Sequence, residues 1–140
     1  MSCVFCAVVA GDLPARRVHE DEHAVAFLDL APLHRGHTLV VPRRHVDSLL
    51  DGAPALAEIG PCVDATARLL VDRLGADGLN LLSSAGPVAG QEVPHLHVHL
   101  LPRYAAAPGL AHLLGDRGAA PAEDLDADLD AVHARLTGSR

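Results

Sequence analysis

The stretch HLHVHLL at residues 95–101 restricts the fold of this chain most strongly, because it alternates imidazole and aliphatic side chains. Successive side chains of a β-strand lie on opposite faces, so this period of two predicts a strand. Leu96, Val98 and Leu100 would then face a core, and the three histidines would share the opposite face. These histidines are His95, His97 and His99.

The other hydrophobic patterns predict an α+β domain with a five-stranded antiparallel sheet, and the length of 140 residues is typical of a single domain spanning residues 1–140. Strands are expected at 17–19, 24–29, 37–42, 79–83 and 96–101. Helices are expected at 3–10, 54–74 and 121–137, with a mobile loop at 105–120. Gly60-Pro61 fits the second helix poorly, so we expect a kink there or a start near Pro61.

Composition and charge exclude several classes of partner. The net charge of −7 argues against nucleic-acid binding, although a small anion responds only to local groups. No stretch reaches about 18 apolar residues, and no basic segment precedes an apolar run at the N-terminus. We therefore expect no membrane partner, a cytoplasmic location and reduced cysteines.

Three kinds of chemistry fit a row of imidazoles: metal binding, general acid–base catalysis and nucleophilic catalysis. A solvated strand face without function is the fourth interpretation. The loop AGQEVP precedes the row, and its glycine allows backbone N–H groups to approach an anion. His37 opens the preceding apolar strand. This context favours a phosphate ester as the electrophile.

At these residues the sequence resembles the histidine triad (HIT) superfamily of nucleotide hydrolases and transferases. The similarity to bacterial Hint-like members also covers CVFCAVVAGDLPARRVHEDEHAVAFLDLAP at 3–32, GHTLVVPRRHV at 36–46 and AGQEVPHLHVHLLPRY at 89–104. The part after Tyr104 is not diagnostic. Transferase branches typically carry Gln at the third triad position, so His99 favours the hydrolase branches.

The resemblance implies that His97 attacks the α-phosphorus of a purine nucleotide conjugate and forms a nucleotidyl-histidine intermediate, which water then hydrolyses. The leaving group would be an amine, a phosphate or a nucleotide, as in a nucleoside phosphoramidase. The carbonyl of His95 would orient the His97 ring, and His99 and His37 would contact phosphate oxygens. Neutral imidazole is nucleophilic near pH 7, so no organic cofactor is expected.

Several further residues are candidates for binding the nucleotide. The family position that binds ribose is Asp29 here, and a carboxylate suits vicinal hydroxyls. Ser84 replaces the side-chain amide that is usual in this family, and its hydroxyl has a shorter reach to phosphate. Further candidates are Gly90, Gln91 and Glu92 in the loop and Phe5 beside the base.

Cys3 and Cys6 have the C-x-x-C spacing of zinc ligands. The resemblance implies that His45 and His95 complete a tetrahedral zinc site of structural role, which would attach the N-terminus to the sheet. The alternative is a pair of buried cysteines in an N-terminal helix.

Several alternatives stay open. The chain could be a nucleotide-binding regulatory module with incidental turnover, a dinucleoside polyphosphate hydrolase, or an unrelated enzyme whose three histidines hold a metal. The resemblance also implies a homodimer formed through a helix and an edge strand. The remaining histidines show no partner pattern and are expected at the surface: His19, His23, His34, His112 and His133.

Overall fold

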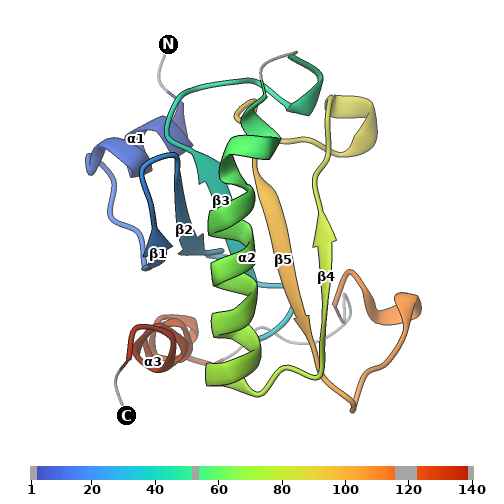
Figure 1. The fold of residues 1–140 in the computed structure, drawn as a ribbon. Helices are drawn as coiled ribbons and strands as arrows, with labels where there is room; N and C mark the ends of the chain where they lie inside the picture. The colour runs from blue at the N-terminus through green and yellow to red at the C-terminus, as the bar shows by residue number, and fades with distance from the viewer. Residues whose placement is uncertain (1–2, 52–53, 116–122, 139–140) are drawn as a thin grey trace.

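The computed structural model describes residues 3–51, 54–115 and 123–138, and its centre is an antiparallel sheet with the strand order β1-β2-β3-β5-β4 (Figure 1). The strands are β1 (Arg17–Glu20), β2 (Ala24–Leu28), β3 (Thr38–Pro42), β4 (Gly78–Leu82) and β5 (Val98–Arg103). The helices are α1 (Val4–Ala10), α2 (Ala55–Leu74) and α3 (Leu125–Leu136). The predicted α+β class and five-stranded antiparallel sheet are confirmed.

Each face of the sheet packs against its own helices. Helix α2 crosses one face, with α3 beside it, and this layer buries the larger part of the core (Figure 1). Helix α1 covers the opposite face near β2 and β3, where Val8 packs with Phe27, Leu39 and Val41. In the described part of the chain, no helix is long and apolar enough to span a membrane.

Helix α2 begins at Ala55 and runs through Pro61 to Leu74, so the expected start near Pro61 is wrong. Proline inside a helix removes one backbone donor and costs about 3 kcal/mol or more. Ile59 and Cys62, on either side of the proline, are completely buried. Leu70 and Leu74 of the same helix are buried as well. Burial of each large aliphatic side chain contributes roughly 1.5–3 kcal/mol, so the three together outweigh the missing hydrogen bond.

Helix α3 begins later than the sequence predicts. Its N-cap is Asp124, whose carboxylate accepts a hydrogen bond of 2.9 Å from the backbone N–H of Ala127. This cap satisfies one of the free donors of the first turn and sets the start at Leu125. Pro121, the expected start, lies outside the described residues.

The strand that carries the histidine row is shifted by two residues from its predicted bounds. Ladder pairing of β5 begins at Val98, which lies opposite Val40 of β3. The three preceding residues continue the alternation without ladder bonds, and Leu96 instead donates its N–H to the carbonyl of Val46 at 2.8 Å. Leu96, Val98 and Leu100 all belong to the core under α2, as predicted. The histidines therefore lie on the opposite face, the one that α1 covers.

Candidate functional site

The three histidines of the row share one face but differ in exposure. His95 is completely buried, His97 is 7% exposed, and His99 is partly exposed. Phe5 of α1 packs edge-on against this row, with its ring centroid 5.1 Å from that of His97 and 6.0 Å from that of His95. A row covered in this way is not a solvated strand face. The structure thus places Phe5 against the histidines, where it orients their rings.

The ring of His97 is held in one tautomer. Its Nδ1 lies 2.8 Å from the carbonyl oxygen of His95. A carbonyl oxygen only accepts, so Nδ1 carries the proton and Nε2 keeps its lone pair. Within the described ranges, no hydrogen-bond partner reaches this Nε2. The hydroxyl of Ser83 donates to the carbonyl of His97 at 2.8 Å and holds its backbone as well. In its neutral form, His97 therefore presents a free nucleophilic nitrogen at Nε2.

A second hydrogen-bond chain sets the tautomers of His37 and His99. The backbone N–H of Leu33 donates to Nδ1 of His37 at 3.1 Å, so the proton of the neutral ring lies on Nε2. That Nε2 lies 2.9 Å from Nδ1 of His99 and donates to it. The proton of neutral His99 is then on its Nε2. Its ring centroid is 4.9 Å from that of His97, so the ring that carries the N–H donor is a direct neighbour of the ring that carries the lone pair.

Burial keeps these rings neutral. It lowers the pKa of His37 to about 4, although the nearby carboxylate of Asp29 raises it in part. Burial also lowers the pKa of His99, and the neighbouring His97 acts in the same direction. At neutral pH both rings are uncharged, and their function depends on which nitrogen carries the proton.

Asp29, His37 and His99 converge closely enough to hold a metal ion, because one ligand atom of each lies within 4.8 Å of the others. Their hydrogen bonds argue against it. A metal on Nε2 of His37 would move the ring proton to Nδ1, directly opposite the N–H of Leu33. Metal-bound imidazole needs an acceptor at its second nitrogen, and here it meets a donor. Oδ1 of Asp29 accepts from the N–H of Ala31 at 2.8 Å, and Oδ2 lies 3.5 Å from His37.

The three histidines of the row do not form a common metal site. Two Cys, His, Asp or Glu groups with metal-ligand geometry occur among the described residues: Asp29, His37 and His99 form one, and Cys3, Cys6, His45 and His95 form the other. His97 belongs to neither. The geometry disfavours the alternative of an enzyme that binds a metal through the whole row.

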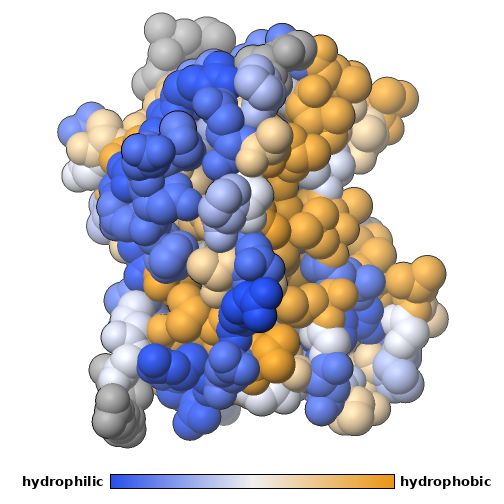
Figure 2. Space-filling view, viewed as in Figure 1, coloured by the Kyte–Doolittle hydropathy of each residue, from blue (hydrophilic) through white to orange (hydrophobic). Residues whose placement is uncertain are grey.

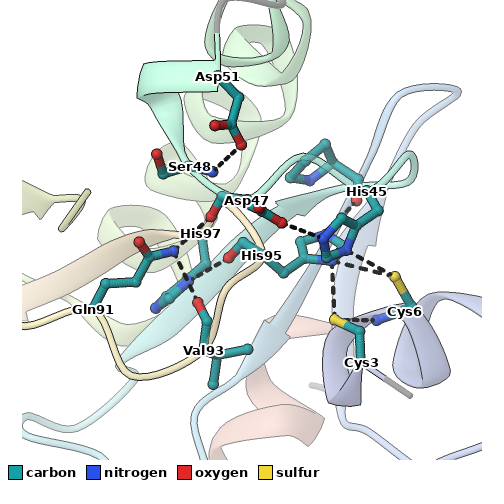
Figure 3. A network of polar contacts seen from close by, with 11 residues as sticks. Cys3, Cys6, His45, Asp47, Ser48, Asp51, Gln91, Val93, His95 and His97 are labelled. Carbon is teal, nitrogen blue, oxygen red and sulfur yellow. Dashed lines mark hydrogen bonds and ion pairs between the residues drawn. The ribbon is translucent and has the colours of Figure 1, made fainter. Parts of the chain in front are cut away.

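The loop between β4 and β5 holds four of the predicted nucleotide-binding residues. A Cβ on Gly90, which has a φ of +98°, would lie 3.8 Å from the hydroxyl of Ser84, so these two residues face each other. Gln91 uses its amide within the protein. It accepts from the N–H of Gly86, and it donates to the carbonyls of Asp47 and Val93 (Figure 3). Exposed Glu92 lines the same pocket as Cys3 and Cys6.

The second group lies between α1 and the start of β5, where two thiols and two imidazoles point toward one another (Figure 3). Nδ1 of His95 is 3.4 Å from Sγ of Cys3 and 3.5 Å from Sγ of Cys6, and Nδ1 of His45 is 3.3 Å from Sγ of Cys6. Zinc bonds of about 2.3 Å to sulfur and about 2.1 Å to nitrogen, at a tetrahedral angle, separate such atoms by about 3.6 Å. The four side chains fit a zinc ion.

The outer contacts of this group also suit a metal. Nε2 of His95 donates to the carbonyl of Pro42 at 3.0 Å, and Nε2 of His45 donates to the carboxylate of Asp47 at 2.7 Å. Both Nδ1 lone pairs therefore point toward the thiols. Burial acts to raise the pKa of the Cys3 thiol, but hydrogen bonds from Cys6 outweigh it, so that the pKa is lowered and the thiolate is favoured.

The sequence analysis missed several residues of these networks, among them Ser83, whose hydroxyl donates to the carbonyl of His97. Asp47, two positions after His45, orients its ring, and this spacing was a signal that could have been used. Leu33 and Pro42 act through a backbone N–H and a backbone carbonyl. Side-chain patterns do not report such groups, so only the fold reveals them.

We expect acid to destabilise the protein through His37. Its pKa is about 4 in the folded chain and about 6.5 when unfolded, so the unfolded state binds the proton more readily. The contribution of His37 to the free energy of unfolding is fully present above pH 6.5. It is lost as the pH decreases toward 4, by at most about 3 kcal/mol. Urea unfolding of chelator-treated His37→Asn should show a smaller loss over this window. His112→Gln, at an exposed position, should keep the wild-type slope, and equal slopes in all three proteins would contradict the assignment.

The chain is similar in sequence to a family of known proteins. The family model of the HIT domain matches residues 10–106, more than half of the chain. The Bacillus subtilis protein named Protein hit is 41% identical over 109 residues, which cover 77% of this chain and 75% of that protein. The Arabidopsis thaliana adenylylsulfatase HINT3 is 35% identical over 102 residues, covering 72% of this chain and 52% of that protein.

A solved structure extends the similarity to the whole fold. The zinc-bound histidine triad family protein from Mycobacterium smegmatis superimposes with a TM-score of 0.76 at 37% identity. The match covers 97% of this chain and 94% of that chain. The similarity therefore includes α3 as well as the part that carries the histidine row.

Proposed function

The chain belongs to the HIT family, and on this premise we propose that it is a nucleotide hydrolase that attacks the α-phosphorus of a purine nucleotide conjugate with His97. The observation that carries the proposal is the pair of tautomers at the triad. Nδ1 of His97 donates to the His95 carbonyl and leaves Nε2 as a nucleophile. His99, beside it, carries its proton on Nε2 and can donate to a phosphate oxygen.

The first step joins Nε2 of His97 to phosphorus while the bond from phosphorus to the leaving group breaks. The electron pair departs with that group, and an amine also takes up a proton from solvent as it leaves. His97 becomes an imidazolium whose Nδ1–H still donates to the carbonyl of His95. His99 donates a hydrogen bond to a phosphate oxygen and stabilises the developing charge without giving up its proton. Water then attacks phosphorus and releases one proton to solvent, and the electron pair of the P–N bond returns to Nε2.

The remaining residues bind the nucleotide in this proposal. Asp29 is the candidate for the ribose hydroxyls, because its Oδ2 lies next to the triad, 3.5 Å from the Nε2 of His37 that donates to His99. Ser84 and Gly90, which face each other, are the candidates for the phosphate. We favour an amine leaving group, as in a phosphoramidase. The relative named adenylylsulfatase supports a sulfate as the second candidate.

Removal of the nucleophile should abolish turnover. We expect His97→Ala to lower kcat by roughly 10⁴-fold or more on a nucleoside phosphoramidate, because the covalent path is lost. His99→Ala should lower it by roughly 10²–10³-fold, as removal of one stabilising donor does. His23→Ala, at an exposed position in the turn between β1 and β2, is the matched control and should keep wild-type turnover.

Trapping the intermediate tests the same assignment independently. A phosphorus–nitrogen bond on imidazole survives alkali and is labile in acid. Quenching with alkali after mixing with α-labelled substrate should leave label on the peptide that contains His97. Turnover by His97→Ala at a rate near wild type, without trapped label, would exclude the mechanism. The alternatives give other outcomes. A regulatory module would bind nucleotides tightly but would not turn over phosphoramidate, sulfate, phosphate or dinucleoside substrates. A dinucleoside polyphosphate hydrolase would prefer dinucleoside polyphosphates.

We also propose that Cys3, Cys6, His45 and His95 hold a structural zinc ion. Bound there, the zinc would cross-link the start of α1 to the segments that enter β5 and leave β3, and it would stabilise the fold without taking part in the reaction. His95 would anchor this cross-link two residues before the nucleophile. Reduced thiols are required, which favours the cytoplasm as the location.

Asp47 provides a test that does not depend on activity. We expect Asp47→Asn to weaken zinc binding by about 10–100-fold, because the carboxylate no longer orients His45. Competition with a chromophoric chelator would measure the affinity. Asp64→Asn, an exposed aspartate on α2, should leave it unchanged. Cys3→Ser combined with Cys6→Ser should remove zinc and lower Tm while some turnover remains. Metal-free protein purified without chelators would contradict the site.

We propose further that the chain forms one domain over residues 1–140 and pairs as a homodimer. Helix α3 shares the core under α2 through Leu129 and Val132, which supports a single domain. Strand β4 lies at the sheet edge, Leu81 is 59% exposed there, and Figure 2 shows hydrophobic residues gathered on this side. Light scattering should give twice the chain mass for wild type and one chain mass for Leu81→Glu. A monomeric wild type at micromolar concentration would refute the dimer.

A further inference from the structure

The hydrogen-bond chain of His37 and His99 begins at a backbone group, the N–H of Leu33. Leu33 lies in the loop 29–37 between β2 and β3, which contains no regular secondary structure. A loop of this kind needs further contacts to hold one N–H in place. The residues that contact it therefore help determine the tautomers of the site.

The segment 104–115, which follows β5, supplies these contacts. The hydroxyl of Tyr104 donates to the carbonyl of Arg35 at 2.8 Å. His34 donates from Nε2 to the carbonyl of Leu113 at 2.8 Å. His34 is half-buried and bonded, so the expectation that it is an unpartnered surface residue is wrong. Two hydrogen bonds from different points of the segment thus hold the residues next to Leu33.

Gly115 makes the third contact, and it touches Leu33 itself. Its φ of +74° lies in the left-handed region, and a Cβ there would be 2.5 Å from the carbonyl oxygen of Leu33. The atom in the way is backbone, so no rotamer change can relieve the overlap. Any side chain at position 115 would displace Leu33 and lengthen its hydrogen bond to His37, which is 3.1 Å.

We propose that the segment 104–115 is a clamp that holds Leu33 in place and so sets the tautomers of His37 and His99, with Gly115 and His34 as its positioning residues. The match to the HIT family model ends at residue 106, so the contacts from Leu113 and Gly115 lie beyond it. The clamp itself is a property of the fold. Its effect on turnover rests on the function proposed above.

Loss of the clamp would reverse the direction of the hydrogen bond between His37 and His99. Without the N–H of Leu33, the proton of His37 can occupy Nδ1, and Nε2 then becomes an acceptor. Nδ1 of His99, 2.9 Å away, must in turn carry a proton to keep the hydrogen bond between the rings. Nε2 of His99 would then present a lone pair to the substrate. A lone pair repels a phosphate oxygen, so the donor that stabilises charge is lost.

Two glycines with a similar positive φ provide a matched test. Gly115→Ala and Gly75→Ala both place a side chain on a left-handed backbone, because the φ of Gly75 is +69°, but a Cβ on Gly75 meets nothing within 4 Å and Gly75 lies outside the segment 104–115. Nitrogen-15 NMR of the imidazoles at pH 7 reports which nitrogen is protonated. We expect Gly115→Ala to move the His37 proton toward Nδ1 and to lower kcat by roughly 10²-fold, with a smaller change in KM. Gly75→Ala should change neither.

A second pair of variants covers the case in which Gly115→Ala does not fold. His34→Phe removes the bond to Leu113 without adding backbone strain, and it should shift the tautomers in the same direction. His34→Gln keeps an N–H donor on that side and should restore the wild-type pattern. Wild-type tautomers in folded Gly115→Ala, or in His34→Phe, would overturn the clamp. A tautomer shift in a protein whose wild type turns over no nucleotide would instead support the clamp and reject the proposed function.

Discussion

The hydrogen bond from Nδ1 of His97 to the carbonyl of His95 is the contact on which the rest of the site depends. It joins two residues of one extended segment, so the alternating sequence itself places donor and acceptor at the right spacing. Because the bond uses Nδ1, the free nitrogen of His97 is the one farther from the backbone. An uncharged ring becomes a nucleophile in this way, with no other base required.

His95 connects the two groups of side chains through different atoms. Its carbonyl orients the candidate nucleophile, whereas its imidazole lies between the thiols and the carbonyl of Pro42. The ring of His95 is completely buried, and Phe5 packs against both it and His97. Displacement of His95 would therefore move the His97 ring as well, and a metal held at His95 would stiffen the nucleophile without touching the substrate.

The sequence was most informative where side chains repeat with a period. Alternation in HLHVHLL predicted the strand, its buried face and the shared face of the histidines, and C-x-x-C spacing predicted two of the four converging ligands. It misled where tertiary packing overrides local preference, as at Pro61, which α2 accommodates because its neighbours are buried. The sequence did not predict backbone partners such as the N–H of Leu33, because no side-chain pattern indicates them.

Burial explains why backbone partners matter so much in this site. By lowering the pKa values of His37 and His99, it removes positive charge from the rings that face the candidate nucleophile. A charged ring donates from both nitrogens whatever surrounds it, but a neutral ring donates from only one. The direction of each hydrogen bond must then be set by the groups around the ring. The N–H of Leu33 sets the tautomers of His37 and, through it, of His99. The carbonyl of His95 sets the tautomer of His97.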